Sequence, residues 1–189
     1  MNILAPLAVL VAIAPGLAVA ARGQEGSALP AAAAVAKPHA YLSIEPVPRG
    51  RTFEIAVVVE ILKGFHMNAH KPSQEYLIPT TITPQLPSGI QAIATEYPEG
   101  RLEKFAFSPN EPLSVYTGSV TLRMKLEATS GAPLGEVRLP LTLRYQACND
   151  TTCLPPVNVP VEVKFQIAAT GAAARAIHPE IFGITAKAN

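Results

Sequence analysis

Apolar residues that alternate with polar ones constrain this 189-residue chain more than any other feature of its sequence. Between Ser119 and Glu127, and again between Val157 and Phe165, every second residue is apolar. This period of two is typical of a β-strand with one face in a core and the other in solvent. The same pattern predicts four further strands, at Tyr41–Ile44, Thr52–Ile61, Ile90–Ala94 and Glu136–Ala147.

Turn residues separate these predicted strands at short intervals. Pro48, Arg49 and Gly50 follow the first strand, and we expect the first two strands to form a hairpin. The chain has 19 prolines and no tryptophan, and proline is costly inside a helix but tolerated at sheet edges, as expected for Pro160. The sequence therefore predicts an all-β fold, an immunoglobulin-like antiparallel β-sandwich.

The first 20 residues have the character of a secretory signal peptide. Ile3 to Ala20 carries no charge and ends in Ala18-Val19-Ala20, a small-x-small pattern that suits a signal peptidase. No Lys or Arg precedes this run, and about 18 apolar residues are at the lower limit for a membrane span, so an uncleaved anchor is the alternative. We expect export to the periplasm or another oxidising compartment, where a disulfide persists.

Composition divides the rest of the chain into three parts. Residues 21–37 are rich in Ala, Gly and Ser without a period, which predicts a flexible leader. One folded domain is expected over residues 38–168, followed by an Ala-rich tail, residues 169–189, with a helical tendency around Ala172–Ile177. The net charge is +1, and no block of Lys or Arg indicates a nucleic-acid or anionic-lipid partner.

Cys148 and Cys153 are the only cysteines, and four residues with turn composition separate them. Cys148 falls where the strand that precedes it ends, and the next strand brings Cys153 back alongside, which permits a disulfide. In the chain-entropy model a loop this short adds only about 2 kcal/mol of stability, so redox exchange is favoured over a structural role, which stays open. No Lys, Arg or helix N-terminus adjoins the pair, which indicates a relay whose partner supplies the activated thiolate.

Other residues that could carry chemistry have simpler interpretations. His66, Met67 and His70 offer imidazole and thioether ligands that suit copper, although packing at a turn is the favoured interpretation. Tyr145 is predicted to be a core residue with a hydrogen-bonded hydroxyl, and its closeness to Cys148 in the sequence leaves a supporting redox role open. Two thiols alone do not complete a zinc site, and neither a metal nor an organic cofactor is expected. No hydrolase or nucleotide-binding motif is present in the sequence.

Four short segments of the chain are similar to those of one known family. They are Gly-Phe-His-Met-Asn-Ala-His-Lys-Pro at 64–72, Tyr-Pro-Glu-Gly at 97–100, Val-Tyr-Thr-Gly at 115–118, and Tyr-Gln-Ala-Cys…Cys-Leu-Pro-Pro at 145–156. Together they resemble the N-terminal periplasmic domain of the thiol:disulfide interchange protein DsbD, over residues 38–168. The segment with the two cysteines is the most specific of the four.

The resemblance implies an immunoglobulin-like domain with protein thiol–disulfide oxidoreductase activity. By that resemblance Cys153 attacks the substrate disulfide and Cys148 resolves the mixed disulfide. The family also shields its cysteines with a loop that bears an aromatic residue, which would fall between Phe105 and Leu113 here, with Phe107 as the best candidate. The best-known members have one more residue between their cysteines than this chain has.

The resemblance also implies partners. These are a thioredoxin-like electron donor or a membrane thiol carrier on one side, and oxidised periplasmic proteins on the other. The family's membrane carrier and C-terminal thioredoxin-like domain have no counterpart in this sequence, so we expect a free-standing, monomeric module. The alternative is a noncatalytic interaction or chaperone-like sandwich with one structural disulfide.

Overall fold

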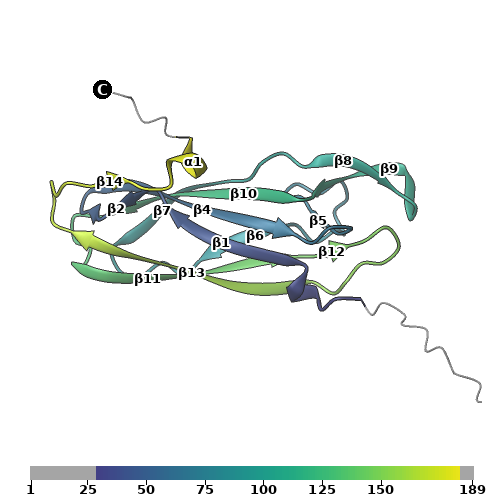
Figure 1. Cartoon of the computed structure of the whole chain (residues 1–189), viewed down its shortest axis with the longest axis horizontal. Helices are drawn as coiled ribbons and strands as arrows, with labels where there is room; N and C mark the ends of the chain where they lie inside the picture. The colour runs from purple at the N-terminus through teal and green to yellow at the C-terminus, as the bar shows by residue number, and fades with distance from the viewer. Residues whose placement is uncertain (1–28, 184–189) are drawn as a thin grey trace, which may run out of the picture.

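The computed structural model describes residues 29–183, and their fold is the predicted immunoglobulin-like antiparallel β-sandwich (Figure 1). One main sheet has the strand order β1 (Ala36–Leu42), β4 (Arg51–Ile61), β10 (Ser119–Ala128), β7 (Ile90–Glu96). The other main sheet has the order β3 (Val47–Pro48), β13 (Val157–Ala168), β11 (Gly135–Tyr145), β6 (Thr81–Pro84). All pairs within them are antiparallel except the short contact between β3 and β13.

Smaller elements lie at the two ends of the sandwich. At one end is a third sheet with the order β12 (Ala147–Cys148), β5 (His66–Asn68), β9 (Ser108–Tyr116), β8 (Arg101–Phe105). At the opposite end are the strand pair β2 (Ile44–Glu45) and β14 (Arg175–Ala176) and the helix α1 (Pro179–Phe182) (Figure 1). A 3-10 turn, η1 (Ala32–Ala34), precedes β1. The cysteine end and the C-terminal end of the domain are therefore far apart.

The core forms between the apolar faces of the two main sheets. In β10 every second residue from Val120 to Leu126 is buried, and in β11 the same holds from Leu139 to Tyr145. Phe53 of β4 and Phe165 of β13 meet across the sandwich with their ring centroids 5.2 Å apart. Each such side chain contributes roughly 1.5–3 kcal/mol on burial, and the same core cluster continues to Ala147 and Leu154, which flank the cysteine loop.

The first strand begins earlier in the chain than the sequence predicts. Val35 and Ala36 are each only 1% exposed, and β1 starts at Ala36 rather than at Tyr41. The Tyr145 hydroxyl donates a hydrogen bond to the Ala32 carbonyl (2.7 Å) and accepts one from the Ala36 amide (3.2 Å). The end of the predicted leader is therefore part of the sandwich, while residues 1–20 and the start of the leader lie outside the described residues.

Replacement of Tyr145 by phenylalanine tests this anchor. Tyr145→Phe is expected to lower the free energy of unfolding by about 1–2 kcal/mol, because the buried Ala36 amide and the Ala32 carbonyl lose their partner. Urea denaturation of the wild type and the variant measures the change. Tyr76→Phe is the matched control, since Tyr76 is 76% exposed. Equal stability of the two variants would contradict the anchoring role.

The C-terminal segment differs from the sequence prediction in its structure. The expected helix around Ala172–Ile177 is absent there; residues 175–176 form β14, and the helix α1 starts at Pro179 instead. Proline suits the first helical position because its missing amide has no helical partner there in any case. Arg123 of β10 donates a hydrogen bond to the Ile181 carbonyl, and its guanidinium lies 5.6 Å from the Phe182 ring centroid.

Two other predictions need correction. β1 pairs with β4 as expected, but β2 and β3 lie in the connection, so the pair is not a tight hairpin. The strand predicted at Glu136–Ala147 is two strands, because the chain changes partners at Gln146. Tyr145 still pairs with Val157 of β13, whereas Ala147 pairs with Met67 of β5. The sequence pattern also gave no indication of β5, β6, β8 or β9.

Candidate functional site: the disulfide at the end of the sandwich

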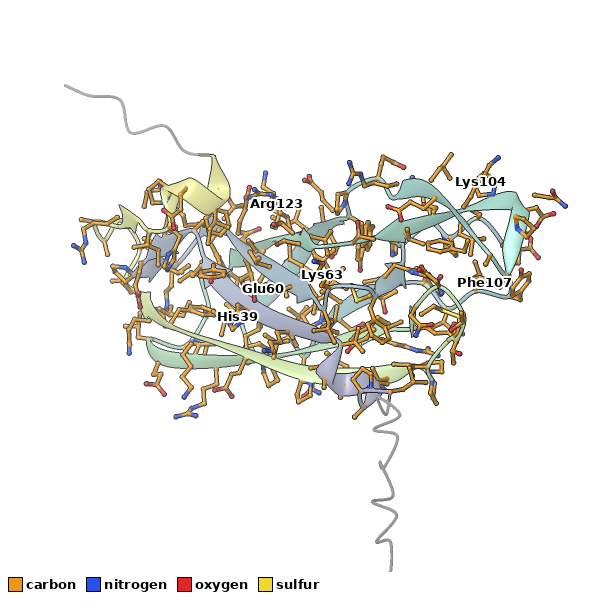
Figure 2. All side chains as sticks on the ribbon, turned by 45° about the vertical axis from the view of Figure 1, so that its right-hand side comes forward. His39, Glu60, Lys63, Lys104, Phe107 and Arg123 are labelled. Carbon is orange, nitrogen blue, oxygen red and sulfur yellow. A yellow bond between two sulfur atoms is a disulfide. The ribbon has the colours of Figure 1, made fainter. Side chains whose placement is uncertain are left out.

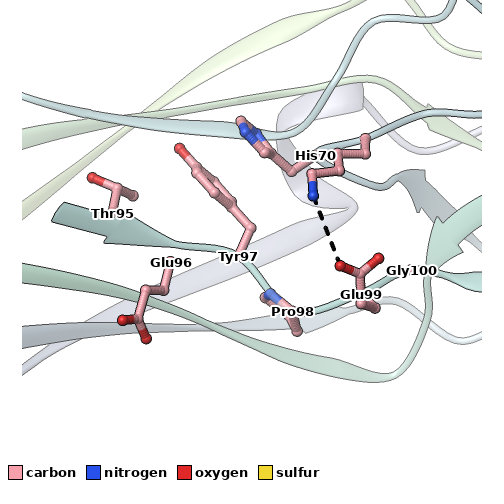
Figure 3. Close-up of a pocket in the computed structure, with 8 residues that line it drawn as sticks. His70, Thr95, Glu96, Tyr97, Pro98, Glu99 and Gly100 are labelled. Atoms are coloured by element: carbon pink, nitrogen blue, oxygen red, sulfur yellow. Dashed lines mark ion pairs between the residues drawn. The ribbon is translucent and has the colours of Figure 1, made fainter.

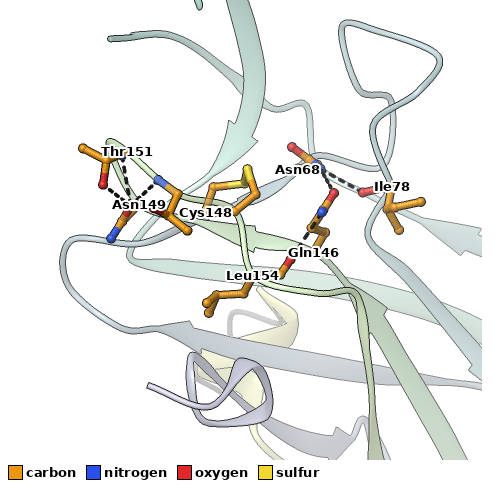
Figure 4. The surroundings of a disulfide bond; sticks show 9 residues. Asn68, Ile78, Gln146, Cys148, Asn149, Thr151 and Leu154 are labelled. Carbon is orange, nitrogen blue, oxygen red and sulfur yellow. Dashed lines mark hydrogen bonds between the residues drawn. A yellow bond between two sulfur atoms is a disulfide. The ribbon is translucent and has the colours of Figure 1, made fainter. Parts of the chain in front are cut away.

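Cys148 and Cys153 form a disulfide with an S–S distance of 2.02 Å and Cα atoms 4.0 Å apart. The loop between them is a tight turn organised by Asn149, whose side-chain Oδ1 accepts hydrogen bonds from the backbone amides of Thr151 and Thr152 (Figure 4). The Asn149 amide in turn donates to the Thr152 carbonyl at 2.9 Å. The turn composition recognised in the sequence thus places the two cysteines opposite each other, as predicted.

Gln146 holds the base of this loop. Its Nε2 donates to the Leu154 carbonyl (3.3 Å), and the Leu154 amide donates to the Ala147 carbonyl (2.8 Å). On the other side, Asn68 Nδ2 donates to the Ile78 carbonyl (3.1 Å) and reaches Gln146 Oε1 at 3.5 Å (Figure 4). The Gln residue of the Tyr-Gln-Ala-Cys segment therefore connects the cysteine loop to β5.

The two cysteines differ in their access to solvent. Cys148 lies in β12 and is 2% exposed, whereas Cys153 is exposed. A partner thiolate from solvent thus has access to the Cys153 sulfur and not to the Cys148 sulfur. The disulfide has one outward and one inward end.

His66 lies beside the inward cysteine, although the two residues are far apart in sequence. β5 and β12 are antiparallel, and His66 is directly opposite Cys148 in their register. Side chains opposite each other lie on the same face, with Cβ atoms about 4.5–5.5 Å apart. From its sequence context alone, His66 is expected only as a copper ligand or a residue packed at a turn. No local sequence pattern could predict that His66 lies beside Cys148, because their contact depends on the pairing of two very short strands.

An aromatic stack covers His66. The Phe105 ring lies parallel to the imidazole with centroids 4.0 Å apart, and Phe107 stacks on Phe105 at 5.4 Å. Phe105 is 8% exposed, while Phe107, the predicted cap residue, is 45% exposed. Figure 2 shows Phe107 at the same end of the molecule as the yellow disulfide. The structure therefore places the predicted cap residue at the disulfide end, and adds Phe105 and His66 beneath it.

Burial keeps the His66 imidazole neutral. Desolvation lowers the pKa of His66 to about 4, and the negative charge of Asp150 opposes this shift. Both residues line a cavity of about 420 Å³ that Glu103 and Lys63 also border. At neutral pH the imidazole therefore offers one N–H donor and one nitrogen acceptor.

The three residues considered as copper ligands are not brought together. His70 stacks on Tyr97 with centroids 3.5 Å apart, and its Nδ1 lies 3.0 Å from the Thr80 carbonyl. Figure 3 shows this second pocket, where an ion pair joins Lys71 and Glu99. Met67 is fully buried in the core. Within residues 29–183 no group of three His, Cys, Asp or Glu side chains could hold a metal ion.

Tyr145 lies in the core next to the cysteine loop. Its side chain is completely buried, and burial raises the pKa of the hydroxyl above its usual value of 10. Both of its hydrogen bonds go to the backbone of residues 32 and 36. This arrangement matches the predicted core role with a hydrogen-bonded hydroxyl.

Fold and site together define an immunoglobulin-like domain with one short disulfide loop at the end of its sandwich. The family model described as "Thiol:disulfide interchange protein DsbD, N-terminal" matches residues 32–165. The chain belongs to this DsbD N-terminal domain family, as the sequence segments predicted.

Two solved structures are similar to the chain. The N-terminal periplasmic domain of ScsB from Proteus mirabilis has a TM-score of 0.50 at 12% identity, covering 79% of this chain and 51% of that chain. This chain thus spans about half of that ScsB chain. The reduced DsbD N-terminal domain of Neisseria meningitidis has a TM-score of 0.39 at 15% identity, covering 71% of this chain and 88% of that one. No curated protein matches the chain.

None of the helices in the described part of the chain is long and apolar enough to span a membrane.

Proposed function

We propose that this protein is a periplasmic thiol–disulfide interchange module, which accepts reducing equivalents from a thioredoxin-like donor or a membrane thiol carrier and passes them to oxidised periplasmic proteins. The observation that carries the proposal is the unequal exposure of the disulfide, with Cys153 accessible and Cys148 buried. Membership of the DsbD N-terminal family supports it. The Cys-x4-Cys loop is the site of exchange.

Reduction of the module takes two steps that balance in atoms and electrons. A donor thiolate attacks the Cys153 sulfur, a donor–Cys153 disulfide forms, and the bond to Cys148 breaks with both electrons leaving on Cys148, which takes up a proton. The second donor thiolate then attacks the donor sulfur of this mixed disulfide and releases Cys153. The donor ends oxidised and the module reduced.

Delivery to the substrate uses the same cysteines in the same order. The Cys153 thiolate attacks a sulfur of the substrate disulfide, and one substrate sulfur leaves as a thiolate. Cys148 then loses its proton and attacks Cys153, which restores the intramolecular disulfide and releases the second substrate thiolate. The buried position of Cys148 suits it to this resolving step, because it meets no partner other than Cys153.

The test is reduction of the oxidised protein by reduced thioredoxin, used as a representative thioredoxin-like donor. We expect both thiols to appear in a thiol-labelling assay while the circular dichroism spectrum stays that of the folded domain. A disulfide that thioredoxin does not reduce, or a domain that unfolds on reduction, would favour the noncatalytic sandwich with a structural disulfide. Reduction of the insulin disulfides by the reduced protein measures electron transfer in the opposite direction, from this protein to a substrate.

Removal of the cap residue is expected to speed exchange. Phe107→Ala should increase the rate of disulfide reduction by thioredoxin about three- to tenfold, because it removes the outer ring of the stack on His66 and lets the thioredoxin surface approach the disulfide more closely as it attacks Cys153. The rate of disulfide reduction is measured by stopping the reaction at several times and labelling the free thiols. Leu102→Ala is the control, since Leu102 is 71% exposed on β8 of the same hairpin. Identical rates for both variants would argue against a cap.

A further inference from the structure

One side of β5 carries two buried polar atoms, His66 Nε2 and Asn68 Oδ1. His66 is 3% exposed and Asn68 is 1% exposed, yet within residues 29–183 neither atom has a hydrogen-bond partner. The two residues are separated by one position on a strand, so they share a face. Such unpartnered atoms are rare in native interiors and destabilise the state that contains them.

The face they share is the one that carries the inward cysteine. Cys148 is directly opposite His66, and the Asn68 amide donates to the Gln146 carbonyl on the same side of the pairing. Phe105 covers the other side of the imidazole and offers no hydrogen-bonding group. In the strand pairing, Cys148 is therefore the residue that lies opposite the imidazole.

The redox state of Cys148 decides what that sulfur offers to His66. A disulfide sulfur has no proton to donate and is a weak acceptor, whereas a thiol is an S–H donor and a thiolate is a strong acceptor. We propose that His66 Nε2 becomes the hydrogen-bond partner of the Cys148 thiol on reduction, so that His66 favours the reduced state of the module. This inference rests on the proposed function and adds a positioning residue to its site.

The step balances without another reactant. When the donor thiolate has attacked Cys153, Cys148 leaves with both electrons of the broken bond and takes one proton from solvent. The resulting S–H donates to the neutral imidazole nitrogen, and no proton is transferred to His66. Resolution of a substrate disulfide reverses the order: the hydrogen bond breaks, the proton returns to solvent and the Cys148 sulfur attacks Cys153.

Charged groups around the imidazole do not provide a competing partner. Asp150 from the cysteine loop, Glu103 from β8 and Lys63 from the turn before β5 border the same cavity. None of them forms a hydrogen bond to the buried Nε2 atom. The charge of Asp150 acts on His66 through space and raises its pKa against the effect of burial.

The experiment is equilibration of oxidised and reduced glutathione with the mature protein at pH 7. His66→Phe keeps an aromatic ring against Phe105 but removes the nitrogen, and we expect its equilibrium constant for reduction to be about three- to tenfold smaller than that of the wild type. His66→Gln restores a side-chain acceptor and is expected to recover part of the loss. His70→Phe is the matched control, because His70 stacks on Tyr97 in a separate pocket, and it should match the wild type.

A second readout needs no substitution. In the wild type, the ¹⁵N chemical shift of His66 Nε2 is expected to change on reduction of the disulfide, while that of His70 stays constant. An unchanged His66 signal, or a His66→Phe equilibrium constant equal to that of the wild type, would overturn the inference about His66. The proposed function would still stand if the wild-type disulfide exchanged with glutathione. A wild-type disulfide that is not reduced in the folded protein would overturn both.

Discussion

Cys148→Ala is expected to form a mixed disulfide with a single-cysteine thioredoxin roughly 100-fold faster than Cys153→Ala does. In the first variant the exposed Cys153 remains, whereas in the second only Cys148 is left, which is 2% exposed in the folded protein. Access to Cys148 requires local opening of β12, and opening that costs about 3 kcal/mol slows the reaction by this factor. The asymmetry follows directly from the position of the loop at the end of the sandwich.

The single-cysteine thioredoxin is first activated as a mixed disulfide with a small thiol, which the cysteine of each variant displaces. Electrophoresis under nonreducing conditions then measures how fast the thioredoxin adduct forms. A thioredoxin without cysteines gives the background, and urea denaturation of both variants checks that each remains folded. Unfolded protein should give equal rates for the two variants. Equal rates in the folded proteins would contradict the assignment of Cys153 as the outward, attacking cysteine.

Acidification from pH 7 to pH 4 is expected to reduce the free energy of unfolding by about 3 kcal/mol through His66 alone. Burial lowers the pKa of His66 from 6.5 to about 4, so between these values the unfolded chain binds a proton that the folded protein does not. The contribution of His66 to stability is therefore nearly complete above pH 6.5, decreases as the pH falls through this window, and changes little further below pH 4.

Comparison of variants separates the contribution of His66 to the pH dependence of unfolding from that of the carboxylates. His66→Phe should lack most of the loss between pH 7 and pH 4, because it has no group to protonate at this position. His70→Phe should retain the full loss, since His66 is intact in it. Urea denaturation of the oxidised proteins at several pH values gives the slopes. A wild type and a His66→Phe variant with parallel stability curves would show that His66 is not buried in its neutral form.

The fold class could be predicted from the sequence because it depends on a local signal. In β10 and β13 the alternation of side chains reports directly which face is buried, and those strands lie where the pattern indicates. The turn between Cys148 and Cys153 is local as well, and Asn149 has the role that its turn propensity suggests. Both features need only neighbouring residues.

The surroundings of the disulfide could not be predicted in the same way. β5 has three residues and β12 has two, which is too short for an alternation of side chains to be visible. His66 and Cys148 meet only because these strands pair across a long separation in the sequence. The start of β1 was missed for a similar reason, since residues 32 and 36 are held by the distant Tyr145 hydroxyl.

The reduction potential of the Cys148–Cys153 disulfide tests the account most directly. Equilibration of the protein with glutathione, followed by thiol labelling and by circular dichroism in parallel, measures the potential and the fold together. We expect a potential above about −300 mV with both redox states folded, as for a disulfide that exchanges with partners. A potential well below this value, or unfolding on reduction, would contradict a role in thiol–disulfide interchange and indicate a structural disulfide.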